Sequence, residues 1–250
     1  MTAFKGRKIL VTGAAQGIGL AIAEEFSRRG ATLVIADMNR DNAEREAGRL
    51  ADEHGVPAHA VIADVSTASG AKAMVDRAAQ AMDGLDALVN NAGILHTQTI
   101  EETTEAAWDK VMAVNLKGVF FACQAALPHF RKASSPRIVN IASMAGRNGG
   151  LKTGLAYSAS KGGVIALSRG LARQLAAEGV NVNVVCPGTT DSAIIRAWPK
   201  ETIAALEATI PAGRLGQPDE IASVVCFLAS KEASFVTGAT LDVNGGQFIG

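Results

Sequence analysis

The stretch K-I-L-V-T-G-A-A-Q-G-I-G, residues 8–19, decides the fold of this chain. It begins with an apolar run of strand length, and three glycines follow. Residues 20–29 then show helical periodicity, which Gly30 ends. Strand, glycine turn and helix form a phosphate-binding unit, because glycines let the backbone approach a pyrophosphate and the helix N-terminus offers free N–H groups. The G-x-x-x-G-x-G spacing departs from the usual G-x-G-x-x-G fingerprint, so a glycine turn without a ligand is the alternative.

Two carboxylates stand at the ends of the next predicted strands. Asp37 follows residues 32–36, about 20 residues beyond the glycines, where a carboxylate bonds both hydroxyls of an adenosine ribose and repels a 2′-phosphate. Arg40 is the only cation close by in sequence, so the pattern favours NAD(H) over NADP(H). Asp64 follows residues 57–62 in the same way. Each carboxylate has an alternative role as the N-cap of the helix after it.

Strands and helices alternate to the end of the chain. Further strands are expected at residues 85–90, 137–142, 180–186 and 239–243, and helices at about 40–54, 67 onward, 101–130, 153–178 and 219–230. Alternation of this kind predicts an α/β fold. We expect one doubly wound Rossmann-type domain over residues 1–250, with a seven-stranded parallel sheet and helices on both faces. A Pro-bounded segment at about 188–212 is expected to form a mobile substrate flap.

Composition narrows the classes of function. Of 250 residues 48% are hydrophobic, and 24 Lys plus Arg balance 24 Asp plus Glu, which argues against a nucleic-acid partner or an anionic membrane surface. We found no apolar run of about 18 residues and expect no membrane span. The N-terminus reaches Gly13 too soon for a signal peptide. Three scattered cysteines suggest reduced thiols in a cytoplasm and neither disulfides nor a metal cluster.

A candidate catalytic pair lies in the stretch from Ser143 to Lys161. Tyr157, the only tyrosine, precedes Lys161 by four residues, which places both on one face of a helix. A phenol has a pKa of about 10, but a cation about 4 Å away stabilises phenolate by about 4 kcal/mol at an effective dielectric of about 20. A tyrosine tuned in this way exchanges a proton with an alcohol or ketone. An ordinary helix-surface pair is the alternative, and a kink or a solvated position is the alternative for Asn115 in the middle of the 101–130 helix.

Taken together, these motifs resemble the short-chain dehydrogenase/reductase family over essentially the whole chain. The motifs in order are T-G-A-A-Q-G-I-G at 12–19, D-V at 64–65, N-N-A-G at 90–93, Asn115, Ser143, Y-S-A-S-K at 157–161, P-G at 187–188 and G-R-L-G-Q-P-D-E-I-A at 213–222. No single motif is decisive, but their order and separations together are specific. The branch they are most similar to includes 3-oxoacyl carrier-protein reductases and polyol or sugar dehydrogenases.

The resemblance implies reversible hydride transfer between a nicotinamide and a secondary alcohol or ketone. It implies a catalytic set in which Tyr157 is the acid/base, Lys161 lowers its pKa, Ser143 holds the substrate oxygen and Asn115 positions Lys161 through a water. The cofactor residues that it implies are Gly13, Gln16, Gly17, Ile18, Gly19, Asp37, Met38, Asp64, Val65, Asn91, Ala92, Gly93, Tyr157, Lys161, Pro187, Gly188, Thr190 and Ser192. Thr190 and Ser192 depart from the family, which more often has Ile or Val and Thr at these places.

The substrate is less clearly encoded. His96, Asn148 and Trp198 are candidate substrate contacts together with Ser143, and Leu151 and Lys152 belong to the same stretch as Asn148. The polar members favour a small polyol, sugar or hydroxy acid. A 3-oxoacyl carrier-protein reductase is the alternative enzyme, and Arg131, Lys132 and Arg173 leave a basic docking surface open for it. A non-catalytic dinucleotide sensor is the alternative outside the enzymes. The family's common homotetramer fits the small residues of the helix after Thr153.

Overall fold

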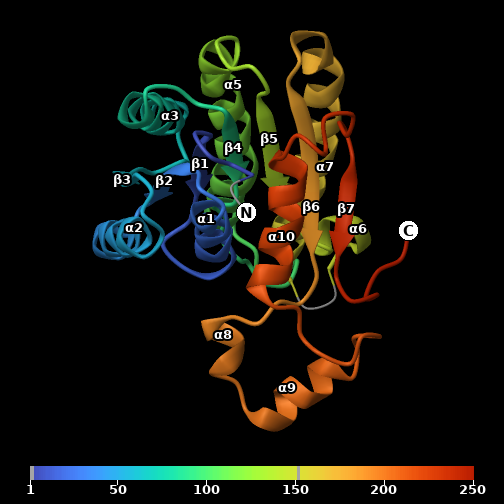
Figure 1. The fold of residues 1–250 in the computed structure, drawn as a ribbon. Coiled ribbons are helices and arrows are strands. Elements are labelled where there is room, and N and C mark those ends of the chain that lie inside the picture. Colours follow the sequence, from blue (N-terminus) through green and yellow to red (C-terminus); the bar gives the residue numbers. More distant parts are fainter. Residues whose placement is uncertain (1–2, 151–152) are drawn as a thin grey trace.

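A computed structural model, which describes residues 3–150 and 153–250, shows a seven-stranded sheet in which every pairing is parallel (Figure 1). The strand order is β3-β2-β1-β4-β5-β6-β7. The chain starts near the centre, winds outward to β3, then returns past β1 and winds outward to β7. The order reverses between β1 and β4, and this switch point is where ligands bind in open α/β sheets. The predicted fold class is confirmed.

The strands agree with the predicted ranges to within two residues. They are β1 (Lys8–Thr12), β2 (Thr32–Asp37), β3 (Ala58–Ile62), β4 (Ala87–Asn90), β5 (Arg137–Ile141), β6 (Asn181–Pro187) and β7 (Thr240–Val243). Helices cover both faces, so the central strands are nearly continuous apolar runs. Along β1, Leu10 belongs to the core on one face, and Ile9 and Val11 belong to the core on the other.

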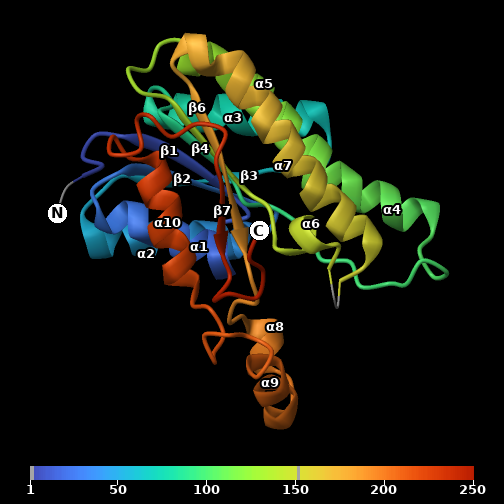
Figure 2. The same ribbon diagram turned by 90° about the vertical axis from the view of Figure 1, so that its right-hand side faces the viewer.

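Two helical layers enclose the sheet (Figure 2). Helices α1, α2 and α10 pack on one face, and α3, α5 and α7 on the other, with α4 extending from α5. The helices are α1 (Gly17–Arg28), α2 (Arg40–His54), α3 (Ala68–Met82), α4 (Glu105–Met112), α5 (Gly118–Phe130), α6 (Ala145–Asn148), α7 (Leu155–Leu175), α8 (Ala193–Arg196), α9 (Lys200–Glu207) and α10 (Pro218–Ala229). Figures 1 and 2 show α8 and α9 projecting from the carboxyl end of the sheet.

Three predicted elements differ from the structure in informative ways. Helix α1 begins at Gly17, three residues earlier than expected, so the last glycines of the loop form its first turn. The single helix expected over residues 101–130 begins at Glu105, and a π-helical turn, η1 (Ala113–Lys117), interrupts it at Asn115. The predicted flap contains α8 and α9, and a small apolar cluster of its own holds it together. Whether the flap moves stays a prediction.

The helical stretch Glu105–Phe130 is, by length and composition alone, apolar enough to cross a membrane. Its mean hydropathy is 1.4 over the relevant window, of which 39% is buried inside the protein. The stretch is not an uninterrupted apolar run, because it contains Asp109, Lys110, Asn115 and Lys117, and the expectation that the chain spans no membrane stays a prediction. The apolar composition has a local cause, because the Val119, Ala122, Ala126 and Phe130 side chains belong to the core on one face of the sheet. A buried core helix has the same properties as a span, so this is weak evidence for a membrane.

A buried chain of amide groups links the centre of the sheet to α7. The Asn90 Nδ2 group donates to Asn140 Oδ1 at 2.8 Å, and Asn140 Nδ2 donates to Ser168 Oγ at 2.8 Å. The Ser168 hydroxyl in turn donates to the Val164 carbonyl. These groups are almost entirely buried. Since a buried polar group without a partner is costly, the chain fixes how α7 lies on β4 and β5.

Replacing Asn140 with Ala should destabilise the fold measurably. The change removes the acceptor of the Asn90 amide and the donor to Ser168, and an unsatisfied buried group costs about 1–3 kcal/mol. We expect urea denaturation to show a loss of about 1–3 kcal/mol in the free energy of unfolding. The exposed Gln80→Ala is the control, with an expected change below about 0.5 kcal/mol. Equal stability of the two variants would contradict this account of the buried chain.

Candidate active site

The glycine loop between β1 and α1 packs so closely on neighbouring backbone and on Asn91 that side chains do not fit at Gly13 and Gly19. Gly13 has a φ of 61°, and a Cβ on Gly19 would lie 2.2 Å from the Gly13 carbonyl oxygen and 2.4 Å from Asn91 Nδ2. The α1 N-cap, Gln16, has no side-chain capping hydrogen bond, so the first N–H groups of this helix are open to an acceptor. Free N–H groups at a helix N-terminus beside a tight glycine turn fit a pyrophosphate. The predicted dinucleotide loop therefore has the geometry that its role requires.

Asp37, at the carboxyl end of β2, is held in place by backbone donors. The Ala15 N–H donates to Asp37 Oδ2 at 3.1 Å, and the Asn39 N–H donates to Asp37 Oδ1 at 3.0 Å. The N-cap of α2 is Asn39, which accepts from the Asn42 N–H, so Asp37 is not the cap that was its alternative role. Met38 beside it is 69% exposed. The carboxylate is fixed next to the phosphate loop, where a ribose would bind.

Asp64 also has a role other than helix capping. Thr67 is the N-cap of α3 and accepts from the Gly70 N–H. Asp64 instead accepts from the backbone N–H and the hydroxyl of Ser66, at 2.8 and 2.9 Å. Val65 lies against the π-helical turn, because a Cβ on Gly118 would be 2.7 Å from the Val65 carbonyl oxygen. Asp64 is thus available as the polar group expected near the adenine.

Thr12 and Asn91 join the glycine loop to the loop after β4. The Thr12 hydroxyl accepts from the Asn91 and Ala92 N–H groups, both at 3.0 Å, and Asn91 Nδ2 donates to the Thr12 and Gly13 carbonyls. These hydrogen bonds fix the distance between the glycine loop and the loop after β4, which lie on the two sides of the switch point. Asn91 was predicted, but the bracing role of Thr12 was not. Its position directly before the first glycine, at a strand end, is the signal that could have found it.

Ser143 and Tyr157 meet at the carboxyl end of β5. The Ser143 Oγ accepts from the Ala145 N–H at 3.1 Å, and the Ser143 hydroxyl lies close enough to the Tyr157 phenol to lower its pKa. Burial raises the pKa of Tyr157 above its ordinary value, and the Ser143 hydrogen bond offsets part of this rise. The two hydroxyls are close enough to hold one substrate oxygen between them.

Lys161 is buried one helical turn beyond Tyr157. Its ammonium is 5.8 Å from the centroid of the Tyr157 ring and donates to the Ile141 carbonyl at 2.8 Å. Desolvation lowers the pKa of Lys161 to about 8. The predicted juxtaposition of phenol and ammonium is present, but the lowered tyrosine pKa is not. The reason is that burial raises the phenol pKa, while the ammonium is bound to a backbone carbonyl and is itself desolvated.

Asn115 occupies the π-helical turn η1 and is completely buried. The Ile94 N–H donates to its Oδ1 at 2.8 Å, and its Nδ2 donates to the Ile94 carbonyl at 3.0 Å and to Ser160 Oγ at 3.1 Å. A Cβ on Gly93 would lie 3.4 Å from both Asn115 Oδ1 and Lys161 Nζ, so the two groups flank this glycine. The position is neither solvated nor a simple kink. Sequence reasoning missed Ser160, although it lies within Y-S-A-S-K.

The residues directly after β6 anchor the start of the flap to β7 and to each other. Pro187 pairs with Val243 of β7, and the Gly188 N–H donates to the Val243 carbonyl. The Thr190 hydroxyl donates to the Gly188 carbonyl at 3.1 Å. Ser192 is the N-cap of α8 and accepts from the Ile195 N–H. The Thr190 and Ser192 hydroxyls therefore have local partners here, and their contacts with a nicotinamide stay predictions.

The candidate substrate residues are scattered. His96 is 8% exposed, bonds Gln98 through Nε2, and packs so closely on Gly154 that a Cβ there would be 2.2 Å from its Nδ1. His96 therefore packs against the residue that precedes α7, and its contact with a substrate stays a prediction. Asn148 accepts from the Gly150 N–H, and Trp198 is 39% exposed on the flap. Leu151 and Lys152 lie outside the described residues.

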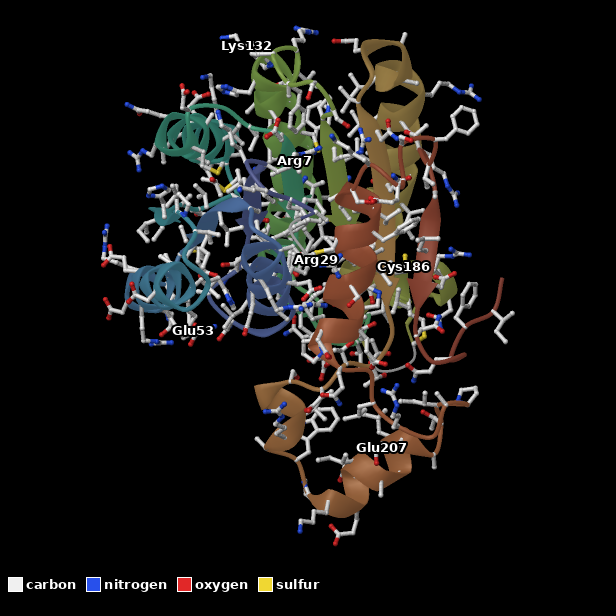
Figure 3. The ribbon with its side chains drawn as sticks, in the orientation of Figure 1. Arg7, Arg29, Glu53, Lys132, Cys186 and Glu207 are labelled. Atoms are coloured by element: carbon white, nitrogen blue, oxygen red, sulfur yellow. The ribbon has the colours of Figure 1, made fainter. Side chains whose placement is uncertain are left out.

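The structure also bears on metal binding and thiols. Among the described residues, Glu24, Glu53 and His54 are close enough to share a metal ion, but Arg49 binds both carboxylates, and the three residues lie on α1 and α2. The absence of a catalytic metal stays a prediction. All three cysteines are buried free thiols. Figure 3 shows Cys186 on β6 near the carboxyl end of the sheet, and desolvation raises the pKa of its thiol to about 11.

The fold and the residues at its switch point define a nicotinamide-dependent oxidoreductase that acts on CH–OH groups. Comparison with known proteins supports this class. A family model described as enoyl-(acyl carrier protein) reductase matches residues 13–247. The chain is 42% identical to cis-4-hydroxycyclohexanecarboxylate dehydrogenase of Sinomonas cyclohexanicum, over 98% of this chain and 97% of that one. It is 36% identical to 3-oxoacyl-[acyl-carrier-protein] reductase FabG of Aquifex aeolicus, over 98% of each.

A solved structure agrees with these relatives. The Pseudomonas aeruginosa RhlG/NADP active-site complex superimposes with a TM-score of 0.93 at 35% identity, over 98% of both chains. The protein belongs to the short-chain dehydrogenase/reductase family, and the resemblance found in the sequence is confirmed.

The pKa values of the catalytic pair predict opposite pH dependence in the two reaction directions. Desolvation lowers the pKa of Lys161 to about 8 and burial raises the pKa of Tyr157, so the pair is fully protonated below about pH 8 and holds one proton fewer above it. Carbonyl reduction consumes a proton, so kcat/KM should fall as pH rises through about 8, and alcohol oxidation should accelerate over the same range. The apparent pKa belongs to the coupled pair. Initial rates in both directions, from about pH 6 to about pH 10, measure this apparent pKa. A reduction rate independent of pH would contradict the predicted pH dependence.

Proposed function

We propose that this protein is an NAD(H)-dependent oxidoreductase that interconverts a secondary alcohol and a ketone on a small polar substrate. In the oxidation direction, the substrate hydroxyl lies between Ser143 and Tyr157, and Tyr157 removes its proton. When bound, NAD accepts the hydride. Lys161 stabilises the phenolate electrostatically, because its ammonium lies over the same face of the site. Asn115 holds the backbone beside Gly93 against which Lys161 lies.

The position of Asp37 carries the choice of NAD. Its carboxylate is fixed by two backbone N–H groups at the end of β2, so a 2′-phosphate on the adenosine ribose would meet a negative charge that cannot turn away. Arg40, the cation closest in sequence, is paired with Glu44 at 2.9 Å. RhlG has a structure with NADP, so membership of the family leaves the cofactor choice open. The charge at Asp37 is the feature that supports NAD.

Asp37→Asn should relax the cofactor preference. The substitution removes the negative charge and keeps an oxygen acceptor. A change of about 1.4 kcal/mol in the free energy of binding is a factor of 10 in affinity. We expect wild type to prefer NAD, and the ratio of kcat/KM for NADP to that for NAD to rise at least about tenfold in the variant. Asp41→Asn, on the first turn of α2, is the matched control and should leave the ratio unchanged. A wild-type preference for NADP would refute the proposal.

A hydroxy acid, polyol or sugar is the proposed substrate class. Asn148, Trp198 and Ser143 remain the candidate contacts. Trp198 lies between α8 and α9, which project from the carboxyl end of the sheet (Figure 1). One relative is a cis-4-hydroxycyclohexanecarboxylate dehydrogenase, whose named substrate is a hydroxy acid. This supports the hydroxy-acid member of the class.

A 3-oxoacyl carrier-protein reductase is the second candidate function, favoured by the similarity to the Aquifex aeolicus enzyme over the whole chain. Such a reductase would need a basic surface for its carrier protein, and one of the three candidate cations is already in an ion pair. Arg131 is paired with Glu178 at 2.8 Å, whereas no ion pair is found for Lys132 or Arg173 among the described residues. Figure 3 shows Lys132 at the end of the molecule opposite the flap.

A substrate screen separates the two candidates. Hydroxy acids and polyols with NAD, and an acetoacetyl thioester with NADH and NADPH, are followed by nicotinamide absorbance. We expect the highest kcat/KM for a hydroxy acid or polyol, and a best rate on the thioester with NADPH would favour the second candidate. Tyr157→Phe is the control for chemistry: it should retain NAD affinity and lose at least about 100-fold in kcat, as general acid–base catalysis contributes about 10²–10⁴-fold. An active Tyr157→Phe would refute the role of Tyr157.

We further propose a cytoplasmic homotetramer. A groove of about 840 Å³ runs over α4, η1, the start of α5 and the middle of α7. It is lined by Met112, Ala113, Leu116, Phe120, Gly163 and Leu167, and by the charged Asp109, Lys110 and Lys117. Apolar side chains and a glycine at this surface fit a second copy of the same helices, as the small residues of α7 suggest. Buried free thiols fit a reducing compartment. A monomer by light scattering at micromolar concentration would contradict the assembly.

A further inference from the structure

The carboxamide of Asn115 has no hydrogen-bonding capacity left for a substrate or a water on its amide nitrogen. An amide group has two N–H donors and an acceptor oxygen. Here both donors are used, one by the Ile94 carbonyl and one by Ser160 Oγ, and the oxygen accepts from the Ile94 N–H. The side chain is therefore a brace between the loop after β4 and α7. What it contributes to the reaction depends on the groups at its two ends.

Ser160 is the end of this brace on α7. Because an amide nitrogen only donates, Ser160 Oγ must accept from Asn115. Its own proton then goes to the Tyr157 carbonyl, 2.7 Å away. The Ser160 side chain is completely buried. A continuous path of hydrogen bonds thus runs from Ile94 through Asn115 and Ser160 to the backbone of Tyr157.

We propose that Ser160 is a positioning residue that holds the tyrosine-bearing first turns of α7 in register with the loop beside the nicotinamide site. The residue does not touch the reacting atoms and acts through Asn115 and Tyr157. This inference rests on the proposed acid–base role of Tyr157 and adds to it a group on which that role depends.

The geometry explains why a hydroxyl is needed at this place. Asn115 is bound to the Ile94 backbone next to Gly93, and Lys161 Nζ lies 3.4 Å from where a Gly93 Cβ would be, so a shift of the Asn115 side chain would move the backbone beside the ammonium. An Ala at position 160 would leave one Asn115 donor unsatisfied in a buried site, and the carboxamide would have to move to find a partner. A movement of about 1 Å away from productive geometry reduces rates by about 100-fold.

Ser168 provides a matched control on the same helix. It is also completely buried, its hydroxyl donates to the Val164 carbonyl at 2.6 Å, and it accepts from the amide of an asparagine, Asn140, at 2.8 Å. Ser160→Ala and Ser168→Ala therefore remove the same group from the same kind of site. Similar losses of stability are expected from both, but only the change at Ser160 interrupts the path to Tyr157.

The first readout needs no substrate. Tyr157 is the only tyrosine in the chain, so the ultraviolet absorbance of phenolate reports on it alone. With NAD bound, we expect Ser160→Ala to raise the phenolate pKa by about one unit, because a less fixed ammonium stabilises phenolate less. Ser168→Ala should leave that pKa within a few tenths of a unit of wild type. NAD affinity, measured by titration, should stay within about threefold in both variants.

The second readout is turnover of cis-4-hydroxycyclohexanecarboxylate, or of the most active compound in the screen. Ser160→Ala should lose about 10–100-fold in kcat with little change in KM, as expected for a positioning defect. Ser168→Ala should retain kcat within about threefold. Ser160→Thr, which keeps the hydroxyl, should recover the wild-type phenolate pKa. If Ser160→Ala does not fold, Ser160→Cys, a weaker donor, replaces it with the same expected directions.

The possible outcomes are distinct. Equal effects of the Ser160 and Ser168 variants on the phenolate pKa and on kcat would overturn the inference, since the hydroxyl would then matter only for stability. An unchanged phenolate pKa in Ser160→Ala would overturn it as well. Failure of wild type to oxidise or reduce any compound in the screen would count against the proposed function, while the phenolate titration would still decide the role of Ser160.

Discussion

The burial of one ammonium group governs the arrangement of this site. Lys161 is 4% exposed, and its contact with the Ile141 carbonyl offsets only part of the desolvation, as the lowered pKa of about 8 shows. A cation in such surroundings interacts strongly with any charge that develops nearby, since water does not screen it. A phenolate on Tyr157 is such a charge. The phenol itself is also desolvated, so burial favours the neutral form of both groups.

The parallel sheet brings together residues that lie far apart in the chain. Asp37 is the last residue of a strand, and Asn91, Ser143 and Gly188 come after strands. The carboxyl ends of parallel strands lie at one edge of the sheet. The reversal of strand order between β1 and β4 opens that edge for a ligand. Each side chain can therefore be supplied by a different loop, while the buried strands keep the loops at fixed separations.

Buried amides and hydroxyls fix these separations more finely. Asn91 bonds to the glycine loop, Asn140 joins two strands to α7, and Asn115 joins the loop after β4 to α7. Each link satisfies its polar groups within the protein, so a shift of either element would leave a donor or acceptor unpaired in a dry region. Such links fix a position more sharply than apolar packing, which tolerates sliding.

The sequence by itself determined the fold class, the family and the approximate ends of the strands, and it predicted which residues form the catalytic set. These features depend on local spacing: apolar runs, glycines after a strand, and a phenol and an ammonium four residues apart. The sequence also left Asp37 and Asp64 between ligand contact and helix capping. The structure excludes helix capping, because Asn39 and Thr67 cap the helices, and the ligand contacts stay predictions.

Only the tertiary structure decided how the site is supported and charged. The π-helical turn at Asn115, the packing of His96 under Gly154, and the raised pKa of Tyr157 all depend on groups that lie 20 or more residues away or on burial. The sequence placed an ammonium beside a phenol and so predicted a lowered phenol pKa. It carried no measure of desolvation, which acts on both groups and exceeds the effect of their spacing along the helix.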